Sequence, residues 1–172
     1  MNFRTNDGVM EIFRSLNGIG NENCFFMTYK ENKVDGAKYG ALGAMGGAIG
    51  GAFAAATAVA NGILEGIEGS DGLLINMTEN GLGMVPLNFN GVPLTLNPEK
   101  MSPVLDKYVF VANEDIEQII VKNYSFLCKK NQKVIIKLKN GKVLNQFAHK
   151  VEKNVPYHEA NFIKFMNKYK NK

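Results

Sequence analysis

A run of 26 residues without a charged side chain, from Tyr39 to Leu64, limits what this chain can fold into more than any other feature of its sequence. The run is largely Gly and Ala, and seven glycines lie between positions 36 and 51. Residues four apart lie along one side of a helix. This spacing relates Gly36 to Gly40, Gly43 to Gly47 and Gly51, and Gly46 to Gly50. Because each glycine costs about 1 kcal/mol in an exposed helix, a stable helix here needs a packing partner.

Three structures fit this segment. A transmembrane helix of 26 residues would span about 39 Å, more than the bilayer core of about 30 Å, although Gly and Ala contribute little transfer energy. A helix or helical hairpin could instead pack within the protein or against a second copy, since small residues let backbones approach closely. A flexible Gly-rich insertion is the third structure. The candidate residues for self-association or membrane contact are Gly36, Gly40, Gly43, Gly47 and Gly51.

Charge is divided unevenly along the chain. Residues 1–121 hold 7 Lys and Arg against 14 Asp and Glu, a net charge of −7, whereas residues 122–172 hold 13 Lys against 2 Glu, a net charge of +11; together they give +4. A basic segment can attract anionic lipid, nucleic acid or an acidic partner. Its cations are all Lys, and Arg is the usual bidentate reader of bases and phosphates. We therefore expect no specific nucleic-acid recognition, and a solvated basic face is the plain alternative.

Hydrophobic periodicity predicts an α+β protein, and the length of 172 residues indicates a single domain, 1–172. Apolar residues at i, i+3, i+4 and i+7 predict an N-terminal helix near 7–16, with Gly18 and Gly20 as its end, and a closing amphipathic helix near 157–169. Short apolar runs predict strands at 24–30, 73–78, 82–87, 108–111, 116–121, 133–139 and 142–148. The pairs Asn80-Gly81 and Asn140-Gly141 predict two tight hairpins. A further edge strand is expected near 92–96.

The second hairpin carries a candidate binding face. With a two-residue loop, Leu138 would face Val143 and Val134 would face Phe147, so that these side chains share one face with Ile136. The other face would then combine Ile135 and Leu144 with the candidate anionic-surface residues Lys133, Lys137, Lys139 and Lys142.

No motif of catalysis, cofactor binding or metal binding is recognisable. The two histidines, His149 and His158, have no spacing typical of a metal site, and Cys24 and Cys128 are expected to be reduced, although a disulfide between them is open. The glycine segment lacks both G-x-G-x-x-G and a Gly-Lys-Ser/Thr phosphate loop. We expect no cofactor. Acidic residues 114 and 115 are expected to cap a turn.

The element order resembles the bacterial, GRAM-type branch of the pleckstrin-homology-like (PH-like) fold. The resemblance rests on residues 72–82, GLLINMTENGL, on residues 113–119, NEDIEQI, and on the Lys-rich hairpin followed by the closing helix. It covers about residues 70–172 with the strand at 24–30. The resemblance implies a bent antiparallel β-barrel or sandwich plugged by the C-terminal helix, and a non-catalytic role in binding lipid head groups, peptides or proteins. Phosphoinositide-binding members place a basic cluster in the first hairpin, whereas the Lys cluster here comes late.

We therefore expect a cytoplasmic binding or scaffold module that meets a protein partner or the anionic inner face of the membrane, with residues 36–64 as an insertion that mediates self-association or membrane contact. An integral or pore-related protein spanned by residues 39–64 is the first alternative. An enzyme is the second, and it would need a cleft that joins His149 or His158 to a carboxylate. The sequence names no ligand.

Overall fold

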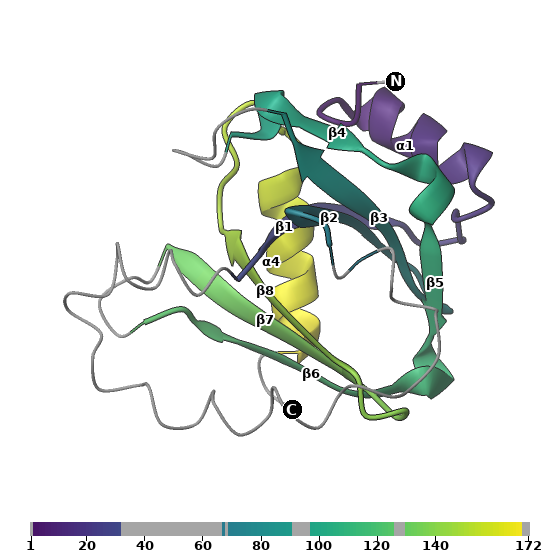
Figure 1. Ribbon diagram of the computed structural model, residues 1–172, viewed down its shortest axis with the longest axis vertical. Coiled ribbons are helices and arrows are strands. Elements are labelled where there is room, and N and C mark those ends of the chain that lie inside the picture. The colour runs from purple at the N-terminus through teal and green to yellow at the C-terminus, as the bar shows by residue number, and fades with distance from the viewer. Residues whose placement is uncertain (1, 32–66, 68, 91–96, 126–129, 170–172) are drawn as a thin grey trace.

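The computed structural model (Figure 1) describes residues 2–31, 67, 69–90, 97–125 and 130–169. Two α-helices are described, α1 (Asn6–Ser15) and α4 (His158–Tyr169). Eight strands are described: β1 (Cys24–Lys30), β2 (Gly72–Met77), β3 (Gly81–Phe89), β4 (Met101–Pro103), β5 (Val109–Ala112), β6 (Ile116–Asn123), β7 (Asn131–Leu138) and β8 (Val143–His149). Short 3₁₀ turns lie at Pro98–Lys100, Leu105–Lys107 and Asn113–Asp115.

The strands form one antiparallel sheet in the order β4-β3-β2-β1-β8-β7-β6, and β5 pairs with the beginning of β3. The sheet bends where β1 meets β8, so β1–β3 and β6–β8 form two half-sheets that cross (Figure 1). The expected α+β class and the antiparallel sheet with a terminal helix are confirmed. Of the expected barrel or sandwich, the barrel does not form, because β5 leads through the 3₁₀ turn into β6 and, among the described strands, no ladder joins β4 or β5 to β6.

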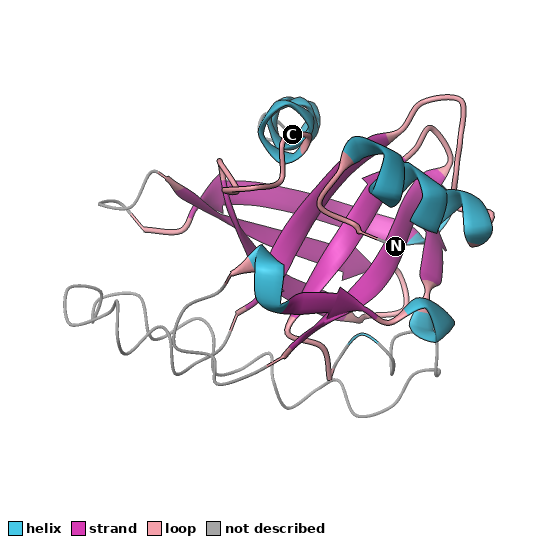
Figure 2. Cartoon of the chain, turned by 90° about the horizontal axis from the view of Figure 1, so that it is seen from above, coloured by secondary structure: helices cyan, strands magenta, loops and turns pink. Residues whose placement is uncertain are grey.

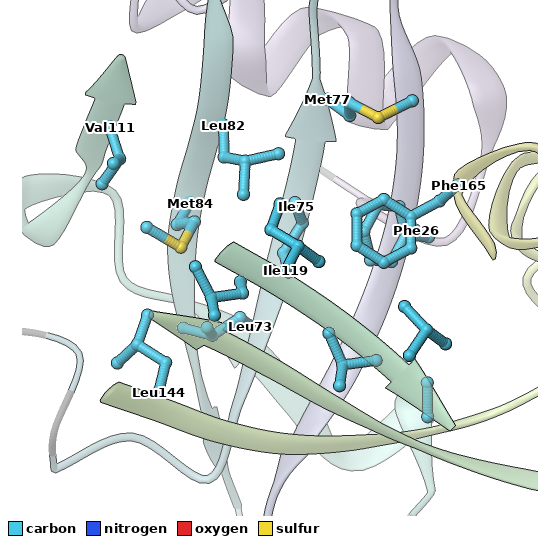
Figure 3. Close-up of a cluster of buried hydrophobic side chains, with 14 of the residues drawn as sticks. Phe26, Leu73, Ile75, Met77, Leu82, Met84, Val111, Ile119, Leu144 and Phe165 are labelled. Atoms are coloured by element: carbon cyan, nitrogen blue, oxygen red, sulfur yellow. The ribbon is translucent and has the colours of Figure 1, made fainter. Parts of the chain in front are cut away.

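The half-sheet β1–β3 is buried on both faces, which explains why β1 and β2 are apolar throughout rather than alternating. Its inner face packs against the half-sheet β6–β8 and α4 (Figure 3). Its outer face is covered by α1, as seen from above in Figure 2. Alternate residues of β1 divide between the two layers: Phe26 belongs to the inner cluster, and Phe25 and Met27 belong to the outer one.

The N-terminal helix forms where its periodicity predicts. Thr5 is the N-cap, and its Oγ1 accepts a hydrogen bond from the Gly8 N–H at 3.1 Å. The buried stripe of α1, which includes Val9 and Phe13, packs on β1–β3. The expected end of the helix at Gly18 is off by one residue, because Asn17 takes the left-handed conformation with φ 53°. Asn tolerates this region better than most residues.

The first hairpin also differs by one residue from its prediction. Thr78 N–H donates to Gly81 O at 2.9 Å, so Glu79 and Asn80 form the loop and Gly81 already belongs to β3. A Cβ on Gly81 would lie 2.2 Å from the Val111 carbonyl oxygen. Glycine is therefore required here for the close approach of β5 to β3, not for a left-handed turn.

The second hairpin has a three-residue loop instead of the predicted two. Leu138 N–H donates to Lys142 O at 2.9 Å, and Gly141 has φ +84°. A glycine in this conformation closes a type I turn with a bulge. The predicted pairs of Leu138 with Val143 and of Val134 with Phe147 are wrong, because Lys137 faces Val143 and Lys133 faces Phe147.

The expected edge strand near 92–96 and the Gly/Ala-rich insertion at 36–64 lie outside the described residues. The three structures considered for the insertion therefore stay predictions. No helix within the described residues is long and apolar enough to cross a membrane.

Candidate functional site

The outer face of β6 and β7 carries a lysine face, which we define as Lys122, Lys133 and Lys137 together with Ile120 and Ile135. On β7, Lys133, Ile135 and Lys137 alternate with the buried residues Val134, Ile136 and Leu138. The register places Lys122 opposite Lys133, and Ile120 opposite Ile135. Side chains of directly paired residues lie on one side of a sheet, so the five form a continuous patch of cations around two half-buried isoleucines.

Two lysines of the predicted binding face lie elsewhere. Lys139 is exposed in the hairpin loop, next to the end of the lysine face. Lys142 opposes Leu138 across the bulge and is only 9% exposed, so it shares the side of the buried residues. The extra loop residue is the reason, since shifting a strand by one position moves each side chain to the opposite face. Sequence alone found Lys133 and Lys137 on the correct face and missed Lys122.

The cations of the lysine face differ in their surroundings. Lys133 Nζ lies 2.6 Å from Glu31 Oε2, and both side chains are about one-quarter exposed. Lys122 is exposed and Lys137 is half-buried, and neither forms an ion pair within the described residues. The positive potential of the face towards solvent therefore comes mainly from Lys122, Lys137 and the neighbouring Lys139.

A second feature, which the sequence did not reveal, is a cluster of titratable side chains where β1, β8 and α4 meet. His149 Nδ1 lies 2.8 Å from the Glu152 carboxylate, which is itself buried. Because a carboxylate accepts hydrogen bonds, the Nδ1–H of His149 donates to it, which orients the ring. His158 is fully buried behind this pair, and its Nε2 lies 2.8 Å from the His149 carbonyl oxygen.

Tyr29 completes the cluster. Its ring packs on His149 with centroids 5.3 Å apart. Its buried hydroxyl lies close to the Glu152 carboxylate but makes no hydrogen bond of good geometry within the described residues. Burial, reinforced by the negative charge of Glu152, raises the pKa of Tyr29 above its ordinary value. The i, i+3 spacing of His149 and Glu152 is the one sequence signal that could have indicated the cluster.

The His149–Glu152 pair borders an open pocket of about 380 Å³. The other lining residues are Asn97, Pro98, Glu99, Val151, Lys153 and Asn154. None of these residues carries a hydroxyl or thiol that the pair could activate as a nucleophile. The contact of a histidine with a carboxylate beside a cleft is the arrangement that the enzyme alternative requires, and its available chemistry is proton transfer at His149.

Other residues considered from the sequence have plain positions. Cys24 is a free, buried thiol, and burial raises its pKa to about 11. Cys128 and the glycines proposed for self-association, Gly36, Gly40, Gly43, Gly47 and Gly51, lie outside the described residues. Within the described part of the chain, no group of three His, Cys, Asp or Glu side chains could hold a metal ion. Residues 114 and 115 lie in the 3₁₀ turn before β6.

Comparison of the chain with protein-family models, with curated proteins and with solved structures finds no match in any of the three. The PH-like resemblance therefore stays a prediction.

Proposed function

We propose that this chain is a non-catalytic binding module of PH-like type that attaches to anionic membrane surfaces through its lysine face. The bent antiparallel sheet and the position of α4 in the bend support the PH-like assignment. This role fits a location on the cytoplasmic side of the membrane, where anionic lipids attract basic surfaces.

The observation that carries the proposal is the register of β6 and β7. It brings Lys122 from one strand against Lys133 of the other and places half-buried isoleucines beside them. A charged rim gives long-range attraction, at about 1 kcal/mol for each Lys near the surface. Apolar side chains in the same patch can enter the boundary of the bilayer and add contact area. A patch that combines exposed cations with apolar side chains fits contact with a lipid surface better than it fits the role of a purely solvated face.

Vesicle co-sedimentation tests this function on the full chain. We expect binding to phosphatidylserine-containing vesicles at low salt, little binding to phosphatidylcholine vesicles, and a loss of binding as salt is raised, because exposed charges are screened. Equal sedimentation with both vesicle types, or none with either, would contradict the proposal. The second outcome would direct the search to an acidic protein partner.

A further inference from the structure

The ladder between β1 and β8, which we call the seam, ends before the last pair that its register would allow. The two strands are paired at Tyr29 with Phe147, and Glu31 N–H donates to Asn145 O. In an antiparallel ladder, hydrogen-bonded pairs recur every second residue. The next such pair after Tyr29 and Phe147 would be Met27 with His149, but the ladder does not reach it.

The imidazole of His158 occupies that place. Met27 N–H donates to His158 Nδ1 at 3.2 Å, and His158 Nε2 lies 2.8 Å from His149 O. Since Nδ1 accepts a hydrogen bond, it carries no proton, and the neutral ring therefore has its proton on Nε2 and donates it to the carbonyl. The ring thus connects the two backbone groups that would otherwise have bonded to each other.

We propose that His158 is a proton-sensitive latch: its neutral ring continues the ladder across the seam, and its protonation opens the seam. Protonation would place a hydrogen on Nδ1, directly against the Met27 N–H, so that two donors face each other. The ring is fully buried, where an unsatisfied donor is costly. Because His158 is the first residue of α4, the same event releases the first turn of that helix from both half-sheets.

The groups around the ring come from each element packed against it. The segment after β8 supplies Glu152, which is bonded to His149, and α4 supplies Glu159. The aromatic ring of Phe162 stacks on His158 with centroids 5.3 Å apart.

Strand β1 supplies the Met27 amide, which contacts the His158 ring, and the Tyr29 hydroxyl, which lies near Glu152. Burial lowers the pKa of His158 below its ordinary value, despite the opposing effects of the bond to His149 O and of the two carboxylates.

The direction of the pH effect follows from this lowered pKa. The folded state binds the proton of His158 less tightly than the unfolded chain, whose histidine has a pKa near 6.5. The contribution of the latch is therefore fully present above pH 6.5 and declines as pH falls towards the lower pKa of the folded protein. This device does not depend on the lysine face or on any ligand.

Amide hydrogen exchange followed by NMR on the full chain tests the latch. We expect the protection factor of the Met27 amide to fall at least tenfold between pH 7.5 and 5, while that of Ile75, in the centre of β2, changes little. The matched variants are His158→Gln and His158→Phe. A glutamine amide can accept from Met27 N–H and donate to His149 O without titrating, so this variant should retain protection at both pH values. Phenylalanine keeps the stacking but has neither polar group, so protection should be low at both.

A direct titration of the His158 ring in the wild-type protein keeps the test decisive if a variant fails to fold. The latch predicts that the ring protonates below pH 6.5 and that the Met27 amide signal changes with the same midpoint. The proposal would be overturned if His158 titrates with the ordinary pKa of histidine, or if the hydrogen-exchange protection of the Met27 amide does not follow the titration of the ring.

Discussion

Replacing Phe26 by alanine is expected to lower the free energy of unfolding by about 3–5 kcal/mol, the range for removing a large buried aromatic ring. Phe26 is fully buried, and its ring packs against two aromatic residues of α4: the centroid distance is 4.5 Å to Phe165 (Figure 3) and 5.5 Å to Phe162. The substitution removes both ring contacts and leaves a cavity where α4 meets β1. In a chain of this size the melting temperature should fall by roughly 10 °C.

Phe110→Ala is the matched control, since its ring is 44% exposed on β5. Urea denaturation of both variants measures the difference. The control should lose much less stability because its ring leaves no interior cavity. Similar losses in the two variants would contradict the assignment of Phe26 to the centre of the core.

Neutralising the solvent-facing lysines is expected to weaken vesicle binding about 100-fold. The variant combines Lys122→Gln, Lys137→Gln and Lys139→Gln, and three charges at about 1 kcal/mol each give about 3 kcal/mol. Lys133 is left unchanged because its removal would leave Glu31 without its partner. Titration with phosphatidylserine-containing vesicles at low salt gives the two affinities.

The control for this variant removes the same charge from other elements, with Lys100→Gln, Lys107→Gln and Lys153→Gln, all exposed positions. If net charge alone drives binding, both variants weaken equally, and the lysine face has no special role. If the face is the binding surface, the control stays within a few-fold of the wild type.

The strands could be predicted because their sequence periodicity agrees with their burial. In β7 the order Lys-Val-Ile-Ile-Lys-Leu alternates half-exposed and buried residues, and the structure retains this alternation. The closing helix was likewise evident from Phe162, Phe165 and Met166, which are all buried. Local pattern and tertiary packing favour the same conformation in these elements.

The register of the second hairpin could not be predicted, because an Asn-Gly pair fits a two-residue loop as well as a bulged three-residue loop. That difference of one residue decided the position of Lys142. The titratable cluster depends on contacts between segments more than 100 residues apart, such as Met27 with His158. No sequence spacing encodes these contacts, so a histidine that bridges a strand ladder has the same sequence signature as any other buried histidine.

The most direct measurement of the central claim is the reactivity of each lysine towards an amine-specific reagent, read by mass spectrometry with and without phosphatidylserine-containing vesicles. The lysine face predicts that Lys122 and Lys137 become protected when vesicles are added, while Lys100 and Lys107, on the β4 and β5 side of the sheet, react as before. Protection of Lys100 and Lys107 with unchanged reactivity of Lys122 and Lys137 would show that another surface meets the membrane, and would contradict the account.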